Sequence, residues 1–81
     1  MPNPQAELSI NQEELLQRFL TLRGKARAAE FITVTEAAEM ADCSRNAVLK
    51  WINEDKVKAA KVGRKYRIWR PSLNHFLRQE T

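Results

Sequence analysis

The fold of this chain follows from one stretch of its 81 residues, TVTEAAEMADCSRNAVLKWINEDKVKAAKVGRKYRIW, at positions 33–69. Thr33 stands three residues before Glu36. This spacing is the capping-box pattern of a helix start, in which each side chain accepts a hydrogen bond from the backbone N–H of the other residue. We therefore expect a helix from about 34 to 41.

A second helix is predicted after a short joint. Asp42 and Cys43 form the joint, and Ser44 is placed to cap a helix from about 45 to 54. Residues at i, i+3 and i+4 share one face of a helix. Three apolar side chains are therefore expected to face inward together: Val48, Trp51 and Ile52.

The apolar pattern changes its period after the second helix. Ala60 and Val62 alternate with Lys61, and Tyr66 and Ile68 alternate with Arg67 and Trp69. Such alternation is typical of strands, and residues 63–65 lie between the two runs. We predict a hairpin with a three-residue loop that contains a glycine. Pro71 suits the first turn of a final helix. The predicted fold class is mainly α with a small β-hairpin.

Charge is concentrated in the same part of the chain. Between 45 and 70 there are nine basic and two acidic residues, which gives +7, whereas the remainder has five basic and eight acidic residues, which gives −3. The two parts account for the net charge of +4. A positive surface of this kind releases counterions from a polyanion and attracts it. The alternative is a solvated basic face without a partner.

Length and composition exclude several classes of protein. A chain of 81 residues makes one domain, and its single cysteine, Cys43, excludes an intrachain disulfide. No Cys/His set has metal-ligand spacing, and the lone His75 offers no base for a catalytic nucleophile. We therefore expect neither a cofactor nor an enzyme. Because there is no signal-peptide pattern and no run of about 18 apolar residues, we expect a cytoplasmic, nucleoid-associated protein.

The amino-terminal part lies outside the basic region. Residues 1–8 contain two prolines and are expected to form a disordered tail, and 9–30 are expected to form a helix with a linker. Ser9 or Asn11 can cap this helix, and Gly24 is expected to end it. Five apolar residues form a stripe along it: Leu15, Leu16, Phe19, Leu20 and Leu22. The stripe either completes the core or, through its first four residues, forms a dimer interface or docks a partner such as an integrase.

The exposed face of the second helix is polar. Arg45 can bond O6 and N7 of guanine, and Asn46 can bond N6 and N7 of adenine, so this face is suited to reading bases in a major groove. Lys50 and Asn53 lie further along the same face and can reach bases or phosphates. Leu49 lies beside the face and either touches a thymine methyl group or packs beneath the hairpin.

The hairpin offers a second set of contacts. Arg64 directly follows the glycine at the tip, where a guanidinium can enter a minor groove, whose negative potential rises as the groove narrows. Tyr66 either bonds a phosphate or is buried with its hydroxyl at the edge, and the two tryptophans are expected to serve in packing. Three basic residues are predicted to bind phosphates, which position a protein without reading sequence: Lys61, Lys65 and Arg67.

Several segments of the chain together resemble a known family. They are TVTEAAE at 33–39, SRNAV at 44–48, VGRKYRI at 62–68 and PSL at 71–73. These segments resemble the excisionase-type helix-turn-helix proteins, which are relatives of the winged-helix DNA-binding head of MerR regulators. The resemblance implies a winged helix-turn-helix domain, which we place at 31–81, preceded by an extra N-terminal helix. In that family the second helix enters the major groove and the wing contacts the minor groove or the backbone.

The same resemblance assigns roles to individual residues. It implies that four residues read the DNA and that Lys65 and Arg67 bind phosphates; the reading residues are Arg45, Asn46, Lys50 and Arg64. Asp42 and Asp55 depart from the family pattern, which commonly has glycine at these positions. Because aspartate tolerates the left-handed backbone conformation better than most residues, we expect the fold to form at a cost on the order of 1 kcal/mol.

The sequence therefore predicts a small, sequence-preferring protein that binds double-stranded DNA. Helix 45–54 would lie in the major groove and the wing, 60–69, on the minor groove or backbone. The resemblance implies either an excisionase-like architectural factor of DNA recombination in mobile elements or a transcriptional regulator. Because one such module buries only about 600–1,000 Å² on DNA, we expect self-association on DNA. The alternative function is a protein-interaction module, antitoxin-like or an adaptor, whose basic face binds an acidic protein.

Overall fold

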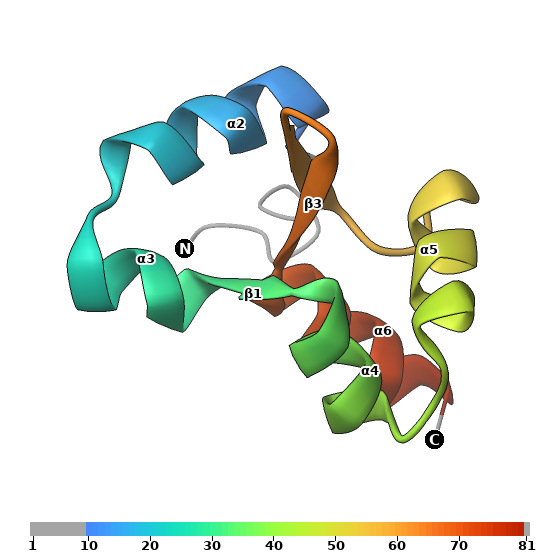
Figure 1. Cartoon of the computed structure of the whole chain (residues 1–81). Helices are drawn as coiled ribbons and strands as arrows, with labels where there is room; N and C mark the ends of the chain where they lie inside the picture. Colours follow the sequence, from blue (N-terminus) through green and yellow to red (C-terminus); the bar gives the residue numbers. More distant parts are fainter. Residues whose placement is uncertain (1–9, 81) are drawn as a thin grey trace, which may run out of the picture.

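The structure is a computed structural model that describes residues 10–80. The tail expected at residues 1–8 lies outside this range. The elements of the described chain are shown in Figure 1 and run in this order: α2 (Gln12–Thr21), α3 (Gly24–Glu30), β1 (Phe31–Thr33), α4 (Val34–Ala41), α5 (Arg45–Asn53), β2 (Ala59–Val62), β3 (Lys65–Trp69) and α6 (Arg70–Glu80). The predicted class, mainly helical with a small β-sheet, is confirmed.

Both helices of the predicted pair begin where the sequence indicated. At α4, the Thr33 hydroxyl accepts a hydrogen bond from the Glu36 backbone N–H at 3.0 Å, and the Glu36 carboxylate accepts one from the Thr33 N–H at 3.2 Å. At α5, the Ser44 hydroxyl accepts from the Ala47 N–H at 3.1 Å. These bonds satisfy donors that the first turn of a helix leaves free. α5 ends one residue earlier than expected, with Glu54 as its C-cap.

An aspartate in the left-handed conformation follows each of these helices. The φ angle is 54° at Asp42 and 59° at Asp55. In both cases the aspartate N–H donates to the carbonyl three residues earlier, and the next N–H donates to the carbonyl five residues earlier. This is the Schellman pattern, which is normally built with glycine at the left-handed residue. The expectation that aspartate replaces glycine at two left-handed positions is confirmed.

The predicted hairpin is formed by β2 and β3, and we call it the wing. Val62 pairs with Lys65, so the loop has two residues, Gly63 and Arg64, and the predicted three-residue loop is wrong. Gly63 has a φ of 64°, and a positive φ at the first loop position is what a tight two-residue turn requires. Lys65, expected in the loop, therefore belongs to a strand.

A third strand, which the sequence analysis did not predict, joins the hairpin. The sheet is antiparallel with the order β1-β3-β2, and β1 pairs with β3 in the register Phe31–Trp69, Ile32–Ile68 and Thr33–Arg67. Three residues are too few to show an alternating pattern, and the partner strand is distant in sequence. The base of the wing is therefore tied to the start of α4.

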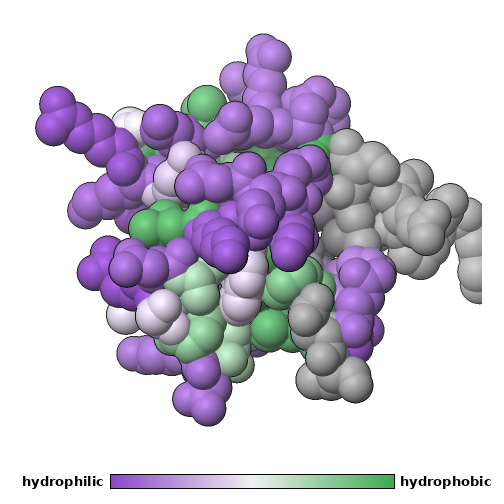
Figure 2. Space-filling view, turned by 90° about the vertical axis from the view of Figure 1, so that its right-hand side faces the viewer, coloured by the Kyte–Doolittle hydropathy of each residue, from purple (hydrophilic) through white to green (hydrophobic). Residues whose placement is uncertain are grey.

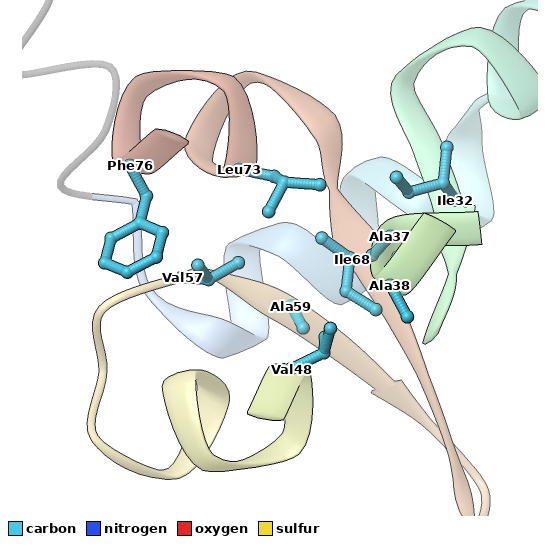
Figure 3. Close-up of a cluster of buried hydrophobic side chains, with 9 residues drawn as sticks. All are labelled: Ile32, Ala37, Ala38, Val48, Val57, Ala59, Ile68, Leu73 and Phe76. Atoms are coloured by element: carbon cyan, nitrogen blue, oxygen red, sulfur yellow. The ribbon is translucent and has the colours of Figure 1, made fainter. Parts of the chain in front are cut away.

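One face of the sheet carries the main core, which also holds α4, α5 and α6 (Figure 3). Ile68 of β3, Val48 of α5 and Leu73 of α6 are completely buried in it. The other members are Ile32, Ala37, Ala38, Val57, Ala59 and Phe76. Figure 3 shows these side chains directed toward one another from helices and strands on several sides. The inward orientation predicted for the second helix is confirmed, because Val48 lies in this core and Trp51 and Ile52 pack against it.

The opposite face of the sheet is covered by α2. Leu15 and Phe19 are 0% and 9% exposed, and they pack with Phe31, Ala60 and Trp69. The rest of the predicted stripe is less buried: Leu16 and Leu22 are half-buried, and Leu20 is 51% exposed. The stripe thus completes the core through Leu15 and Phe19.

A second short helix occupies most of the predicted linker. Asn11 caps α2 by accepting from the Glu14 N–H at 2.8 Å, and Gly24, expected to end that helix, begins α3. α3 buries none of its side chains, so its sequence carries no apolar stripe from which a helix could be predicted. An ion pair between Arg18 and Glu30 joins α2 to the end of α3.

The left-handed residue after α4 leads to a prediction about stability. The Asp42 side chain is exposed, so its substitution acts mainly through the backbone conformation. Asp42→Gly should raise the free energy of unfolding by about 0.5–1 kcal/mol, and Asp42→Ala should lower it by a similar amount, because only glycine adopts a positive φ without strain. Urea unfolding followed by circular dichroism measures both. Equal destabilisation by the two substitutions would contradict this account.

Candidate nucleic-acid interface

The outer face of α5 is open to solvent. Successive residues of a helix are rotated by about 100°, so Asn46, Lys50 and Asn53 lie together, opposite the buried Val48. All three side chains are exposed. Arg45 is also exposed, but it lies on the flank of the helix that faces the wing. The four predicted residues of α5 are therefore accessible, three at the centre of the outer face and one at its edge.

The basic residues of the wing divide between the two faces of the sheet. Lys61 is paired with Tyr66, and both side chains lie on the face toward α5. Lys65 and Arg67 lie on the other face, because side chains alternate along a strand. Arg64 is exposed at the tip. Arg67 is half-buried, and its Nη1 donates to the Tyr66 carbonyl at 3.4 Å. The three residues predicted to bind phosphates thus project from two surfaces.

Tyr66 and Leu49 connect the wing to α5. Both are half-buried; Tyr66 packs against the main core, and Leu49 lies in the groove under the hairpin. The Lys61 Nζ lies 5.8 Å from the centroid of the Tyr66 ring. The packing of Tyr66 against the core agrees with the second alternative for that residue, whereas Leu49 lines the groove and its two alternatives both stay predictions. Through Tyr66 the inner face of the wing packs against the core that also contains Val48 of α5.

A groove of about 490 Å³ lies between the wing and the helix pair. Its walls are formed by Thr33, Val34, Thr35, Arg45 and Leu49 on one side and by Arg64, Lys65, Tyr66 and Arg67 on the other. Four of these residues are cationic and none is acidic. A negatively charged group in this groove would meet positive charge from both walls.

The two carboxylates between 45 and 70 do not neutralise this surface. Glu54 lies 3.7 Å from Lys56 Nζ, and Asp55 lies 2.7 Å from Lys58 Nζ. Both pairs lie in the loop that follows α5. Within residues 10–80, none of the eight predicted site residues forms an ion pair. The charges of the six basic residues among them are therefore available to a partner.

The side of the molecule that carries α5 is shown in Figure 2. Hydrophilic side chains cover most of its upper part, whereas hydrophobic and near-neutral side chains gather in its lower part. The upper part of this face therefore suits a polar, charged partner.

The groove includes residues that sequence reasoning missed. Thr33 and Thr35, at the start of α4, line it together with the four cations. The Thr33 hydroxyl is engaged with the Glu36 carboxylate at 3.1 Å, whereas Thr35 is exposed. The first turn of a helix carries unbonded N–H groups, which favour an anion. In the sequence, these two residues are marked only by the Thr-Val-Thr segment at the start of α4. The pairing of β1 with β3 is what places this segment beside the wing.

Both tryptophans serve in packing, as expected. The ring centroids of Trp51 and Phe76 are 4.8 Å apart, and Trp69 is 7% exposed in the cluster beneath α2. Neither ring is placed as a platform for nucleotide bases.

Neither a metal centre nor a membrane-spanning helix is found among the described residues. Residues 10–80 contain no group of three or more His, Cys, Asp or Glu side chains that could hold a metal ion. No helix in this part of the chain has the length and apolar character needed to cross a membrane.

Comparison with known proteins decides the family. Residues 31–81 match the helix-turn-helix domain. The chain belongs to this family. The match takes in the helix pair α4–α5, the sheet and α6, whereas α2 and α3 precede it. No curated protein and no solved structure shows significant similarity to the chain. This helix-turn-helix protein is accordingly a DNA-binding protein, and its partner is double-stranded DNA.

The turn between the two helices gives a prediction about thiol reactivity. Burial raises the pKa of the Cys43 thiol, and the negative charge of Asp42 raises it further. Because the thiolate is the reactive form, Cys43 should react with iodoacetamide at pH 7 more slowly in the folded protein than in urea. In a pH series, the reaction rate of the folded protein should begin to rise at a higher pH than the rate of the protein unfolded in urea. Asp42→Asn should speed the folded reaction slightly, and identical rates in both states would contradict the shift.

Proposed function

We propose that this helix-turn-helix protein is a sequence-preferring, non-catalytic DNA-binding protein that places α5 in the major groove and its wing on the adjacent backbone and minor groove. The observation that carries the proposal is the groove beside α5, which has cations on both walls and no carboxylate. A short helix with an open polar face fits the major groove, and the phosphate backbone flanks that groove on either side.

The exposed residues of α5 would read the bases. Arg45 can bond guanine and Asn46 can bond adenine, each through two hydrogen bonds. Asn46 lies at the centre of the outer face and Arg45 on its flank, so the two would contact neighbouring base pairs rather than the same one. Lys50 and Asn53, further along the helix, would contact bases or phosphates.

One phosphodiester strand would occupy the groove between α5 and the wing. Lys65 and Arg67 from the wing and Thr35 from the start of α4 would bind its phosphates. Arg64 at the tip would reach past this strand into the minor groove. Lys61, on the side of the wing toward α5, would bind a further phosphate. Contacts to phosphates give affinity and position, and the contacts of α5 give sequence preference.

The biological role would be that of an excisionase-like architectural factor or of a transcriptional regulator. The resemblance of 33–39, 44–48 and 62–68 to excisionase-type proteins supports this pair of roles. A single module buries about 600–1,000 Å² on DNA, so several copies on repeated sites would be needed for tight binding. Selection from a random duplex pool, followed by footprinting, separates the roles. Tandem repeats beside a recombination site favour the first role, and a promoter operator favours the second.

Loss of a reading residue should change sequence preference. Arg45→Ala should weaken binding to the selected duplex by about 1–3 kcal/mol and relax the preference at one position, because a two-bond contact to guanine is lost. Fluorescence anisotropy with the selected duplex and its single-base variants measures both effects. Arg70→Ala removes an exposed arginine outside the groove and is the matched control. If Arg45→Ala weakened every duplex alike, Arg45 would be a backbone contact.

Loss of a phosphate contact should change the salt dependence instead. Lys65→Ala should weaken binding to all duplexes alike and reduce the slope of log K against log salt by about one. Lys56→Ala is the control, because Lys56 lies beside Glu54 and outside the groove. Titrations at several salt concentrations measure the slopes. If the unmodified protein did not bind duplex DNA at low salt, the result would contradict the proposal and favour an acidic protein as the partner.

A further inference from the structure

α2 covers the wing although it lies outside the residues that match the family. Leu15 and Phe19 of α2 are buried against Ala60 of β2 and Trp69 of β3. They lie on the face of the sheet opposite the main core, and Figure 1 shows α2 passing along the upper end of the hairpin. The wing is therefore held from both sides, by α5 on one face and by α2 on the other.

α3 contacts Phe19, the central side chain in the packing of α2 against the sheet. The guanidinium of Arg27 lies 4.4 Å from the centroid of the Phe19 ring, and its Nε donates to the Leu22 carbonyl at 2.9 Å. The Phe19 ring also meets Phe31 of β1 edge to face, with centroids 5.3 Å apart and planes at 87°. Phe19 is thus fixed between α3 and the sheet, which limits the positions that α2 can take.

The outer part of the wing depends on such support. β1 pairs with β3 only as far as Thr33–Arg67, so the hairpin beyond that pair has two strands. A two-stranded hairpin by itself is only marginally stable in water. Val62, which directly precedes the turn, packs against the cluster formed with α2. α2 therefore restrains the segment that carries Arg64.

We infer that α2 is a positioning element for DNA binding, with Phe19 as the residue that fixes the wing and hence the location of Arg64. The inference rests on the proposed function, in which Arg64 contacts DNA. A wing that is already held in its bound position loses little conformational entropy on binding. Release of the wing should therefore weaken the contacts that the wing makes, above all that of Arg64 at its tip, and leave the contacts of α5 unchanged.

The test is a double-mutant cycle between Phe19 and Arg64, measured on the full chain with a selected duplex. Phe19→Leu keeps an apolar side chain but loses the ring contacts. It should weaken binding about three- to tenfold when Arg64 is present and clearly less in an Arg64→Ala background, where the wing keeps only its phosphate contacts. In a Lys50→Ala background its effect should persist, because Lys50 acts through α5. Gln17→Ala, at an exposed polar position on the same helix, is the control and should leave binding unchanged.

A second variant avoids any change to the buried cluster. Arg27→Gln removes the cation over the Phe19 ring and should reproduce the same pattern with a smaller loss, about two- to fivefold. Lys25→Gln, an exposed position on α3, removes the same charge without that contact and should have no effect. Equal losses in the wild-type and Arg64→Ala backgrounds, or no loss from either variant, would overturn the inference.

Hydrogen exchange without DNA separates this inference from the proposed function. In Phe19→Leu, amides of the hairpin should exchange faster, whereas amides of α5 should keep their rates. Uniformly faster exchange would mean that Phe19 only stabilises the fold, and the inference would fail. If Arg64→Ala did not weaken DNA binding, the wing contact of the proposed function would be wrong, and the exchange rates alone would decide whether α2 positions the wing.

Discussion

The alternation of side chains along β3 is the constraint on which the rest of the structure depends. Ile68 enters the main core with the helix-turn-helix, and Trp69, its neighbour, enters the cluster beneath α2. Because successive residues of a strand point to opposite faces, one short strand joins the two halves of the core. β3 is also the middle strand of the sheet. It pairs on one side with β1, which joins it to the start of α4, and on the other side with β2, which completes the wing.

The central position of β3 separates the buried apolar residues of this small domain from its exposed cations. The buried apolar residues lie on the two faces of the sheet, whereas four cations lie around the groove between the wing and the helix pair. Arg45, Arg64 and Lys65 remain exposed around one groove, whereas the nearby Glu54 and Asp55 are matched with lysines in the loop after α5. The separation produces a local positive field stronger than the net charge of +4 suggests, which favours a polyanionic partner.

Much of the fold was predictable because its signals are local. Thr33, Ser44 and Asn11 begin helices by bonding to backbone groups three residues away, and the aspartates at 42 and 55 reverse the chain through their own backbone angles. The failures concern elements without a local signal. β1 has three residues and a distant partner, and α3 buries none of its side chains, so neither has an apolar period that could be recognised. The predicted hairpin loop was one residue longer than the observed loop, because the loop length depends on the register in which β2 and β3 pair.

The sequence by itself determined the helix pair, its caps, the polar outer face of α5 and the basic character of the hairpin. Each of these depends on residues a few positions apart, for which backbone geometry leaves few alternatives. Only the tertiary structure decided which surfaces the cations share. Strand alternation placed Lys61 toward α5 and Lys65 and Arg67 on the other face, and β1 brought Thr35 to the groove. Packing of Leu15 and Phe19 against the sheet likewise depends on residues far apart in the chain, which no local pattern specifies.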